Sequence, residues 1–490
     1  MARLVCGVDS STQSTKVELR DLDSGALIAS GRARHPAATP PASEQDPQAW
    51  WRALSEALAQ VVQHLPDVAA IGVAGQQHGL VLLGGDGTPL RPAKLWNDTT
   101  SAPQARRLVE RRGAGAWAQA TGLVPVASFT ITKLAWVAEH EPDHLAQVER
   151  VMLPHDYLTW RLCGEHVTDR GDASGTGWWS PQHGDYDTDA LAFVVDDPQQ
   201  WLPRLPRVLG PGEAAGRVTT DAAKKLGLPD DVVVSCGTGD NMAAALGLGL
   251  HTGDAVMSLG TSGTLYAVSD TPTTDASGLV AGFADATGNY LPLVATLNAT
   301  LVTDTVARLL DVDIDTLGQL ALEAGQPDTP LVLVPYLEGE RTPDLPSATG
   351  LLTGLRTATS RADLARAAYL GVLCGLFAGV EALDRNGVDL SGRRFLVGGG
   401  ARSPVFQAFA ADLWGRPVTV PAADEAVAAG ACVQAAACLT GQPLVDTAQR
   451  WQLDAGAQVE PPTRLDGDAV RAAYADAAAA AATLADHTAR

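Results

Sequence analysis

Short apolar runs that end in turns of small or hydroxyl-bearing residues recur along the chain. Residues 4–8 form the first run, residues 10–15 form a turn rich in Ser and Thr, and residues 16–19 alternate between polar and apolar positions. This pattern predicts a β-hairpin. Residues 68–74 and 232–235 are largely apolar runs bounded by turn residues, so they predict buried strands. Residues 256–268 repeat the strand–turn–strand pattern of the N-terminus.

Longer segments between these strands have the length and composition of helices. We predict helices over 50–65, 103–112, 133–141, 361–382 and 425–439, and one exposed, Ala-rich helix over 468–485. Because the strand–turn–strand theme restarts after residue 240, we predict two α/β domains of a similar kind, residues 1–239 and 240–490. A chain of 490 residues is long enough to bury the large core that two domains need.

Asp240 stands at the most informative of the predicted turns. It follows the strand at 232–235 and the Gly-rich segment Gly237-Thr238-Gly239. A strand that ends in a tight turn and a single acid can present a carboxylate as a base at the end of a sheet. The alternative is an Asp that caps the helix after it. Further turns of the same kind elsewhere in the chain favour the catalytic interpretation.

Two strand–turn–strand segments have the features of phosphate-binding hairpins. The first ends its strand with Asp9, and the turn after it contains Thr12 and Gln13. The second has the turn Gly260-Thr261-Ser262. Turns of small residues expose backbone N–H groups that can hold phosphate oxygens. The carboxylate of Asp9 could hold Mg²⁺, which prefers oxygen ligands, or could be a structural acid at a strand end.

A third turn contains three consecutive glycines, Gly398 to Gly400, followed by Ala401. It connects a predicted strand to a helix and allows close approach of the backbone to a nucleotide. The turn lacks the Gly-Lys-Ser/Thr of a P-loop, and no G-x-G-x-x-G follows a first strand. The three turns together predict a nucleotide held between two similar domains.

Charge and cysteine content narrow the class of protein. The net charge of −21 and the pI near 4.8 argue against nucleic acid and anionic membrane surfaces as partners. The six cysteines form no C-x-x-C pair, which is typical of a reducing compartment. The N-terminus leads directly into a strand rather than a signal peptide, and no apolar run reaches the roughly 20 residues of a membrane span. We therefore expect a cytoplasmic enzyme.

The order of several short motifs resembles the FGGY family of carbohydrate kinases. The resemblance extends from residue 4 to about residue 437 and rests on EQDPQAWW at 44–51, GQQHG at 75–79, LWND at 95–98, LPHDYL at 153–158, DASGT at 172–176 and PYLEGERTP at 335–343. Each motif is modest alone, but their order is highly specific. Within the family, the GQQHG turn is most similar to that of members that act on xylulose. Gln77 stands where many bacterial members have Met, and its amide could hydrogen-bond a sugar hydroxyl.

The resemblance implies a fold and a reaction. The fold is a pair of ribonuclease-H-like, actin-type ATPase α/β domains that flank a nucleotide and sugar cleft. The N-terminal domain, 1–239, would carry the sugar-binding turn and the first phosphate hairpin. The C-terminal domain, 240–490, would carry the second hairpin, the adenosine turn and the last helices. The reaction is transfer of a phosphoryl group from ATP, with Mg²⁺, to the C5 hydroxyl of D-xylulose.

The resemblance also implies a role for each candidate residue. Asp240 would be the general base, and Asp9 would position Mg²⁺ directly or through water. The sugar would contact Gln77, His78 and Asn241. ATP would contact Thr12, Gln13, Gly260, Thr261, Ser262, Gly399, Gly400 and Ala401. For His78 and the two amides, the alternative is a loop residue that satisfies the backbone.

Other activities remain open from the sequence alone. A kinase for ribulose or a polyol would share all these features except the sugar turn, and Gln77 with His78 argues against glycerol. A chaperone-type ATPase would need a peptide-binding segment, and the chain has none of that kind after residue 439. A non-catalytic sugar sensor would have a degraded base or phosphate turn, whereas Asp9 and Asp240 are both present. A homodimer is also compatible with the sequence.

Overall fold

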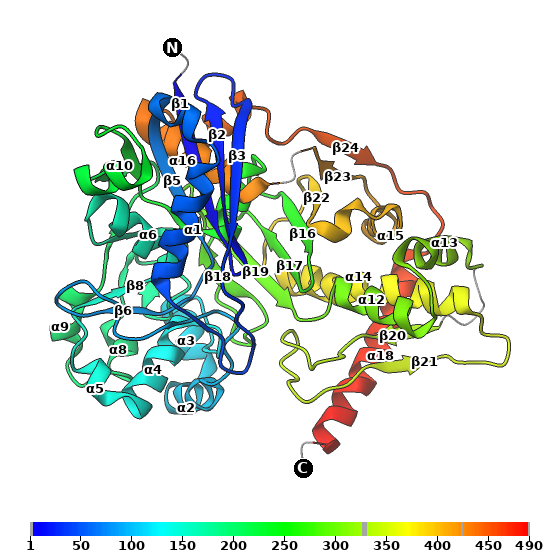
Figure 1. The fold of residues 1–490 in the computed structure, drawn as a ribbon. Helices are drawn as coiled ribbons and strands as arrows, with labels where there is room; N and C mark the ends of the chain where they lie inside the picture. Colours follow the sequence, from blue (N-terminus) through cyan, green and yellow to red (C-terminus); the bar gives the residue numbers. More distant parts are fainter. Residues whose placement is uncertain (1–2, 326–330, 423–424, 489–490) are drawn as a thin grey trace. The chain divides into compact units, whose positions relative to one another are not determined.

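The computed structural model describes residues 3–325, 331–422 and 425–488, which fold into two compact units. The first unit comprises Met1–Leu250, Asp270–Leu291 and Glu425–Asp454, and the second comprises His251–Ser269, Pro292–Asp424 and Ala455–Arg490. Each unit contains a mixed β-sheet with helices packed on it (Figure 1). The predicted α/β class with two units is therefore confirmed. The division into family domains at residue 239 stays a prediction.

The first unit is built on a mixed sheet with the strand order β13-β14-β5-β1-β2-β3. β1 forms the predicted antiparallel hairpin with β2, and it pairs in parallel with β5 on its other side. β14 and the two-residue strand β15 both pair in parallel with β5. The strands are β1 (Leu4–Ser10), β2 (Ser14–Asp21), β3 (Leu27–Arg34), β5 (Val68–Gly75), β13 (Ala214–Arg217), β14 (Val233–Ser235) and β15 (Thr238–Gly239).

Helices cover both faces of this sheet. α1 (Pro47–Ala59) packs over β2 and β3, and the carbonyl oxygen of Ala57 would lie 2.2 Å from a Cβ on Gly31. α16 (Ala426–Thr440) packs over β1 and β5, where Gly7 approaches the carbonyl oxygen of Ala428. Gly7 and Gly31 point to opposite faces, because Gly7 pairs with Glu18, and Glu18 pairs with the residue next to Gly31. The sheet is thus enclosed between these helices.

α11 (Asp240–Gly247) begins at the proposed base and packs closely on α16. A Cβ on Gly247 would lie 1.9 Å from the carbonyl oxygen of Ala426, and one on Gly430 would lie 1.9 Å from that of Ala243. Real Cβ contacts are never this short, so the two helix backbones touch at paired glycines. Residue 240 is therefore anchored through α11 to the core of the first unit.

The other helices and short strands of the first unit surround this framework. The helices are α2 (Ala102–Arg112), α3 (Ala114–Thr121), α4 (Thr130–His140), α5 (Pro142–Leu145), α6 (Pro154–Cys163), α7 (Arg170–Ala173), α8 (Thr188–Leu191), α9 (Pro198–Trp201), α10 (Thr220–Leu226) and α17 (Leu444–Arg450). The strands are β4 (Glu44–Gln45), β6 (Val81–Leu83), β7 (Ala93–Lys94), β8 (Arg150–Met152), β9 (Val167–Asp169), β10 (Trp179–Ser180), β11 (Asp185–Tyr186), β12 (Arg207–Leu209) and β18 (Ala281–Ala284).

The sheet of the second unit runs in the order β19-β17-β16-β22-β23-β24. β16 and β17 form the predicted second hairpin, and β16 pairs in parallel with β22. Its strands are β16 (Ala255–Leu259), β17 (Gly263–Ala267), β19 (Tyr290–Thr296), β22 (Arg394–Val397), β23 (Val418–Pro421) and β24 (Gly456–Val459), with the separate pair β20 (Val332–Val334) and β21 (Leu351–Thr353). Its helices are α12 (Thr300–Leu309), α13 (Ile314–Glu323), α14 (Arg361–Arg385), α15 (Pro404–Trp414) and α18 (Gly467–Thr488).

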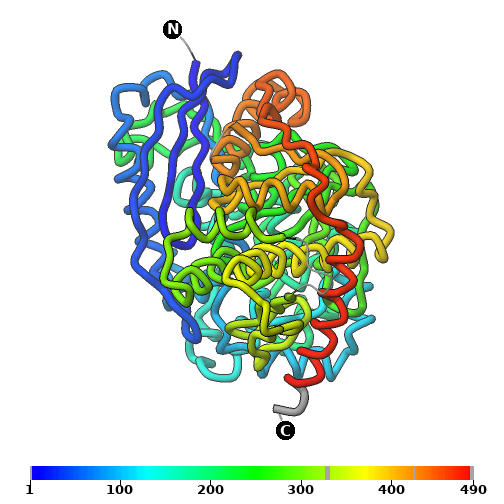
Figure 2. Tube along the Cα trace, turned by 90° about the vertical axis from the view of Figure 1, so that its right-hand side faces the viewer, coloured from blue at the N-terminus to red at the C-terminus, as the bar shows by residue number. Residues whose placement is uncertain are grey.

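Two predicted helices differ from the structure. The helix predicted over 50–65 is α1 followed by the 3₁₀ helix η1 (Val62–Asp67), which contains Pro66 and so cannot continue an α-helix. The C-terminal helix α18, red in Figures 1 and 2, is not exposed all round, because Tyr474, Ala477 and Ala481 are buried on one face. Because Ala is distributed evenly along this segment, the sequence shows no apolar stripe that would mark the buried face of the helix.

The sequence led us to expect no segment that could span a membrane, but the helix α14 is long and apolar enough to do so. By length and composition alone it could cross a membrane, and α16 with α17 would pass the same test together although the chain bends by 117° between them. In the structure, 67% of the apolar window of α14 is buried inside the protein. Such burial is typical of the core helix of a globular unit.

Candidate active site

Three neighbouring strands of the first unit end at the same edge of the sheet. β1 and β15 both flank β5 in parallel, with Asp9 opposite Ala74 and Gly239 opposite Gly75. Side chains that follow the ends of parallel neighbours lie close together. The structure therefore brings Asp9, Gln77, Asp240 and Asn241 to this edge of the sheet. Thr12 reaches the same edge through Gln76, and His78 follows Gln77 in the chain, whereas Gln13 lies in the β1–β2 turn with an exposed side chain.

Asp240, Asn241 and Gln77 form one hydrogen-bond network. The Oδ1 atom of Asp240 accepts from the backbone N of Asn241 at 2.8 Å and from its Nδ2 at 3.0 Å. The same Nδ2 donates to Oε1 of Gln77 at 2.9 Å. Because a carboxylate only accepts, it fixes the orientation of the Asn241 amide, and that amide fixes Gln77. Nε2 of Gln77 is buried and has no hydrogen-bond partner among the described residues, so it remains a donor for a ligand.

The surroundings of the Asp240 carboxyl raise its pKa. Burial, followed by the negative charges of Asp9 and Asp172, raises the pKa of Asp240 to about 7, although the hydrogen bonds from Asn241 act in the opposite direction. A base is most effective when its pKa lies near the working pH. The Asp240 carboxyl is therefore matched to accepting a proton near neutrality.

Asp9 retains a carboxylate oxygen that a metal could use. Its Oδ2 lies 3.3 Å from Nζ of Lys16, which is also 2.6 Å from Oε2 of Glu425. Its Oδ1 is buried without a hydrogen-bond partner in the described part of the chain. Burial raises the pKa of Asp9 to about 6 against the effect of Lys16. One free carboxylate oxygen fits Mg²⁺, which usually binds one or two carboxylates together with water and substrate phosphates.

The hydroxyl of Thr12 is held by two side chains that the sequence did not single out as site residues. Nε1 of Trp96 donates to it at 2.9 Å, and it donates to Oε1 of Gln76 at 3.1 Å. Gln45 donates to the carbonyl oxygen of Thr12 at 2.9 Å. Gln76 lies in the GQQHG motif and Trp96 in the LWND motif. These motifs are the signal in the sequence that could have identified both residues as part of the site. Gln13 has an exposed side chain, and its carbonyl oxygen accepts from the backbone of residue 35.

His78 occupies a strained turn with aromatic neighbours. Its φ of 65° lies in the left-handed region, which is uncommon for a residue other than glycine and is typical of functional turns. Its ring packs against those of Phe129 and Phe283, with centroids 5.1 and 5.4 Å away. A Cβ on Gly175 would lie 2.4 Å from Nδ1 of His78, so only glycine leaves room for the imidazole.

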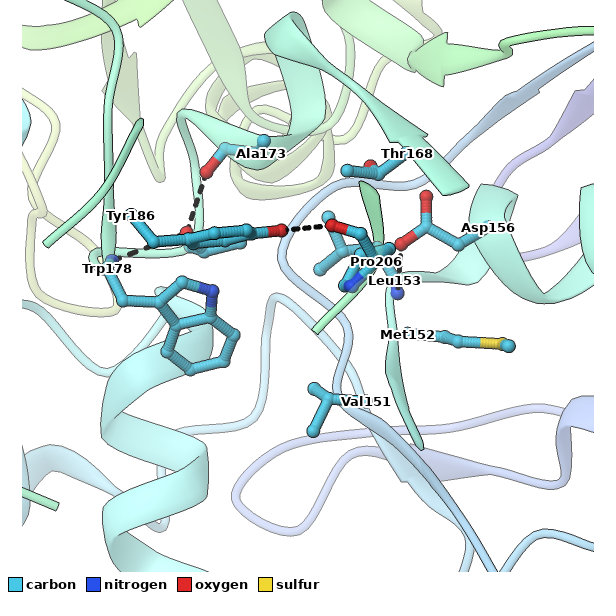
Figure 3. A pocket seen from close by; sticks show the side chains of 10 residues that line it. Val151, Met152, Leu153, Asp156, Thr168, Ala173, Trp178, Tyr186 and Pro206 are labelled. Atoms are coloured by element: carbon cyan, nitrogen blue, oxygen red, sulfur yellow. Dashed lines mark hydrogen bonds between the residues drawn. The ribbon is translucent and has the colours of Figure 1, made fainter. Parts of the chain in front are cut away.

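A small cavity lies in the same unit, but it is not the ligand site. Its volume of about 10 Å³ suits one water molecule rather than a sugar. Tyr186 and Pro206 line it, and the dashed line between them in Figure 3 is the hydrogen bond that the Tyr186 hydroxyl donates to the Pro206 carbonyl oxygen. Its other lining residues are Val151, Met152, Leu153, Asp156, Thr168, Ala173, Thr176 and Trp178.

The predicted nucleotide turns of the second unit lie against each other. Gly260, Thr261 and Ser262 connect β16 to β17, and the 3₁₀ helix η3 (Gly399–Arg402) follows β22, the parallel neighbour of β16. A Cβ on Gly400 would lie 2.8 Å from Cβ of Leu259. Gly399 is exposed, and a Cβ added there would meet no atom of the described residues within 4 Å, whereas Ala401 is buried. The backbone of this glycine turn is thus open to a flat ligand.

The fold and the matches to family models identify a sugar kinase of the α/β type. Residues 4–247 match the N-terminal domain of the FGGY family of carbohydrate kinases, and residues 255–439 match its C-terminal domain. The chain belongs to the FGGY family of carbohydrate kinases, and it is an enzyme of that class. The predicted family and fold are thereby confirmed.

Individual relatives agree with this assignment. A xylulose kinase of Streptomyces coelicolor is 51% identical over 456 residues, which are 92% of this chain and 92% of the relative. The crystal structure of xylulose kinase from Bifidobacterium adolescentis is similar with a TM-score of 0.87 and 40% identity, covering 97% of this chain and 99% of that one. A glycerol kinase from Plasmodium falciparum with ADP shares the fold, with a TM-score of 0.87 at 18% identity over 98% of both chains.

Proposed function

We propose that the protein transfers the terminal phosphoryl group of ATP to the C5 hydroxyl of D-xylulose, giving D-xylulose 5-phosphate and ADP. The observation that carries this proposal is the Asp240–Asn241–Gln77 network, in which a carboxyl of pKa about 7 adjoins amides that can bind hydroxyl groups. The named activity of the 51% identical relative supports xylulose as the sugar.

In the proposed reaction, Asp240 acts as the general base. As the C5 oxygen forms its bond to the γ-phosphorus, Asp240 takes the hydroxyl proton, and the bond from the γ-phosphorus to the β–γ bridging oxygen breaks to release ADP. Positioning and charge neutralisation account for most of the catalysis in phosphoryl transfer. The amides of Gln77 and Asn241 and the imidazole of His78 would orient the sugar so that the C5 oxygen faces Asp240.

The phosphate and adenosine groups would be held mainly by main-chain atoms. Asp9 would hold Mg²⁺ directly or through water, and the ion would neutralise phosphate charge. The N–H groups of the turn with Thr12 and Gln13 would bind phosphate oxygens, since the Thr12 hydroxyl already has partners. In the second unit, phosphate would contact Gly260, Thr261 and Ser262, and adenosine would contact Gly399, Gly400 and Ala401.

The proposal is tested by ADP release from the purified protein with Mg-ATP and one sugar at a time. We expect kcat/KM for D-xylulose to exceed the values for D-ribulose, xylitol and glycerol. Preference for another sugar would retain the kinase but overturn the assignment of xylulose. ATP binding without turnover of any sugar would favour a sensor. The reducing cytoplasm as the compartment and a homodimer as the assembly are further parts of the proposal.

A pH dependence follows from the raised pKa of Asp240. A base must be deprotonated to act, so the rate at limiting concentrations of both substrates should fall as pH drops through about 7, by about tenfold per unit well below it. The pH dependence of this rate reports the pKa values of groups in the free enzyme. The residual activity of an Asp240→Asn variant should lack the limb near 7 and fall only at the lower pH where Asp9, with its pKa of about 6, is protonated. A wild-type profile that stays flat down to pH 5 would contradict the assignment of Asp240 as the base.

A further inference from the structure

A fully buried histidine, His155, packs against two of the strand ends that form the candidate site. It is the second residue of α6. A Cβ on Gly75, the last residue of β5, would lie 2.9 Å from the backbone N of His155. A Cβ on Gly237, one residue before β15, would lie 2.5 Å from Cδ2 of its ring. Glycine therefore makes room for the backbone of His155 at the end of β5 and for its ring just before β15.

Three carboxylates surround the ring of His155. Nδ1 lies 2.7 Å from Oδ2 of Asp172, whereas Nε2 lies 3.1 Å from Oδ1 of Asp156 and 3.9 Å from Oδ1 of Asp169. Only the imidazolium form has an N–H on both ring nitrogens. Burial alone lowers the pKa of His155, but Asp156, Asp172 and Asp169 together raise it to about 9. The three carboxylates therefore favour the cationic form of the ring.

Asp172 connects this ring to the sugar turn. Burial raises the pKa of Asp172, and the His155 ring lowers it, with a smaller lowering from the backbone N–H of His78, so the carboxyl lies near the sugar turn. The turn at His78 has a positive φ, a conformation that persists only when its surroundings hold it. Asp172 is part of these surroundings, because its carbonyl oxygen and Nδ1 of His78 both lie next to Gly175. Nδ1 of His155 fixes the Oδ2 atom of Asp172.

Asp169 connects the same cluster to the base. Its Oδ2 accepts from Oγ1 of Thr238 at 2.7 Å, and Thr238 stands two residues before Asp240. Asp169 also accepts from the backbone N of Gly171 and of Asp172, each at 2.9 Å. It therefore fixes both the short helix α7, which carries Asp172, and the strand end that leads to Asp240.

We infer that His155 is a positioning residue for the phosphoryl transfer proposed above: it fixes the carboxyl of Asp172, whose backbone N bonds Asp169, and these two acids adjoin the sugar turn and the strand that leads to the base. The inference rests on the proposed function. One buried histidine then sets the distance between the two parts of the site that must meet at the reacting hydroxyl. A displacement of about 1 Å in such a site can cost about 100-fold in rate.

The test compares His155→Gln with His155→Lys. Glutamine removes the charge, and we expect it to raise KM for the sugar and lower kcat, each by about tenfold or more, with KM for Mg-ATP unchanged. Lysine restores a cation and should recover most of the loss. His166→Gln is the matched control, because the ring of His166 bonds the Val151 carbonyl oxygen at 3.0 Å in the same unit and touches none of the three carboxylates. It should behave as wild type.

The outcomes separate positioning from a merely structural role. An unchanged sugar KM in His155→Gln, with kcat reduced only in proportion to the folded fraction seen by circular dichroism, would overturn the inference. Recovery no better in His155→Lys than in His155→Gln would also overturn it. Each variant is assayed with the sugar that wild type turns over best, so failure of the xylulose assignment is seen in wild type itself. Absence of turnover with every sugar would overturn both proposals.

Thr238 provides a second pair of variants that leaves the charged cluster intact. Thr238→Val removes the hydroxyl that bonds Asp169 but keeps the side-chain shape, and we expect kcat to fall about tenfold with a smaller change in sugar KM. Thr238→Ser keeps the hydroxyl and should stay near wild type. Equal activity of the Val and Ser variants would contradict the proposed connection, even if His155→Gln does not fold.

Discussion

Replacing Asp240 by asparagine is expected to lower kcat by about 10²–10⁴-fold while the KM values for sugar and Mg-ATP change little. The amide oxygen of asparagine can still accept the two hydrogen bonds that Asn241 donates to Oδ1. The variant therefore keeps the network with Gln77 and loses only the capacity to take a proton. Steady-state kinetics with both substrates varied separates these two effects.

Two comparisons make the Asp240 result decisive. Asp240→Ala should lose activity to at least the same extent and should also raise KM for the sugar, because Asn241 loses its acceptor. Asp313→Asn is the control, since Asp313 caps α13 at the surface and asparagine caps a helix equally well. A kcat for Asp240→Asn within tenfold of wild type would show that another group takes the proton.

Much of the fold follows from local patterns in the sequence. The hairpins at β1–β2 and β16–β17 have turns of small residues between alternating strands, so their pairing is local and the sequence predicts it directly. The segment 425–454 is different, because α16 packs against β1 and β5, which lie far earlier in the chain. The local sequence pattern of this segment does not indicate that it packs against β1 and β5. Ala-rich helices of this kind show their contacts only through glycines such as Gly430.

In the candidate site, too, some features could be predicted from the sequence and others could not. Asp9 and Asp240 could be predicted because each ends a recognisable strand and turn. The hydrogen bonds of Asp172 with His155 and of Asp169 with Thr238 could not be predicted, because these residues meet only in three dimensions. The pattern around Thr12 predicted a phosphate role, whereas the hydroxyl of this residue bonds two distant side chains in the structure. Hydrogen bonds between distant segments carry no periodic signal in the sequence.

Gly430→Ala is expected to lower the free energy of unfolding of the first unit by about 3 kcal/mol or more. The added Cβ would lie 1.9 Å from the carbonyl oxygen of Ala243 and 2.9 Å from the backbone N of Gly247. Both are backbone atoms of α11, so they cannot rotate away as a flexible side chain could, and the two helices must separate. Thermal unfolding followed by circular dichroism should show a Tm lowered by roughly 6 °C or more.

The matched control for Gly430→Ala is the same substitution in another helix of the same unit. Gly115 lies in α3, and a Cβ there would meet only the Cβ of Ala276 at an ordinary 3.8 Å. Gly115→Ala should stabilise by about 0.5–1 kcal/mol, because alanine loses less backbone entropy in a helix. A Gly430→Ala protein that unfolds at the wild-type temperature would contradict the close contact of α11 with α16. Since α11 begins at Asp240, that result would also remove the structural basis for a rigidly held base.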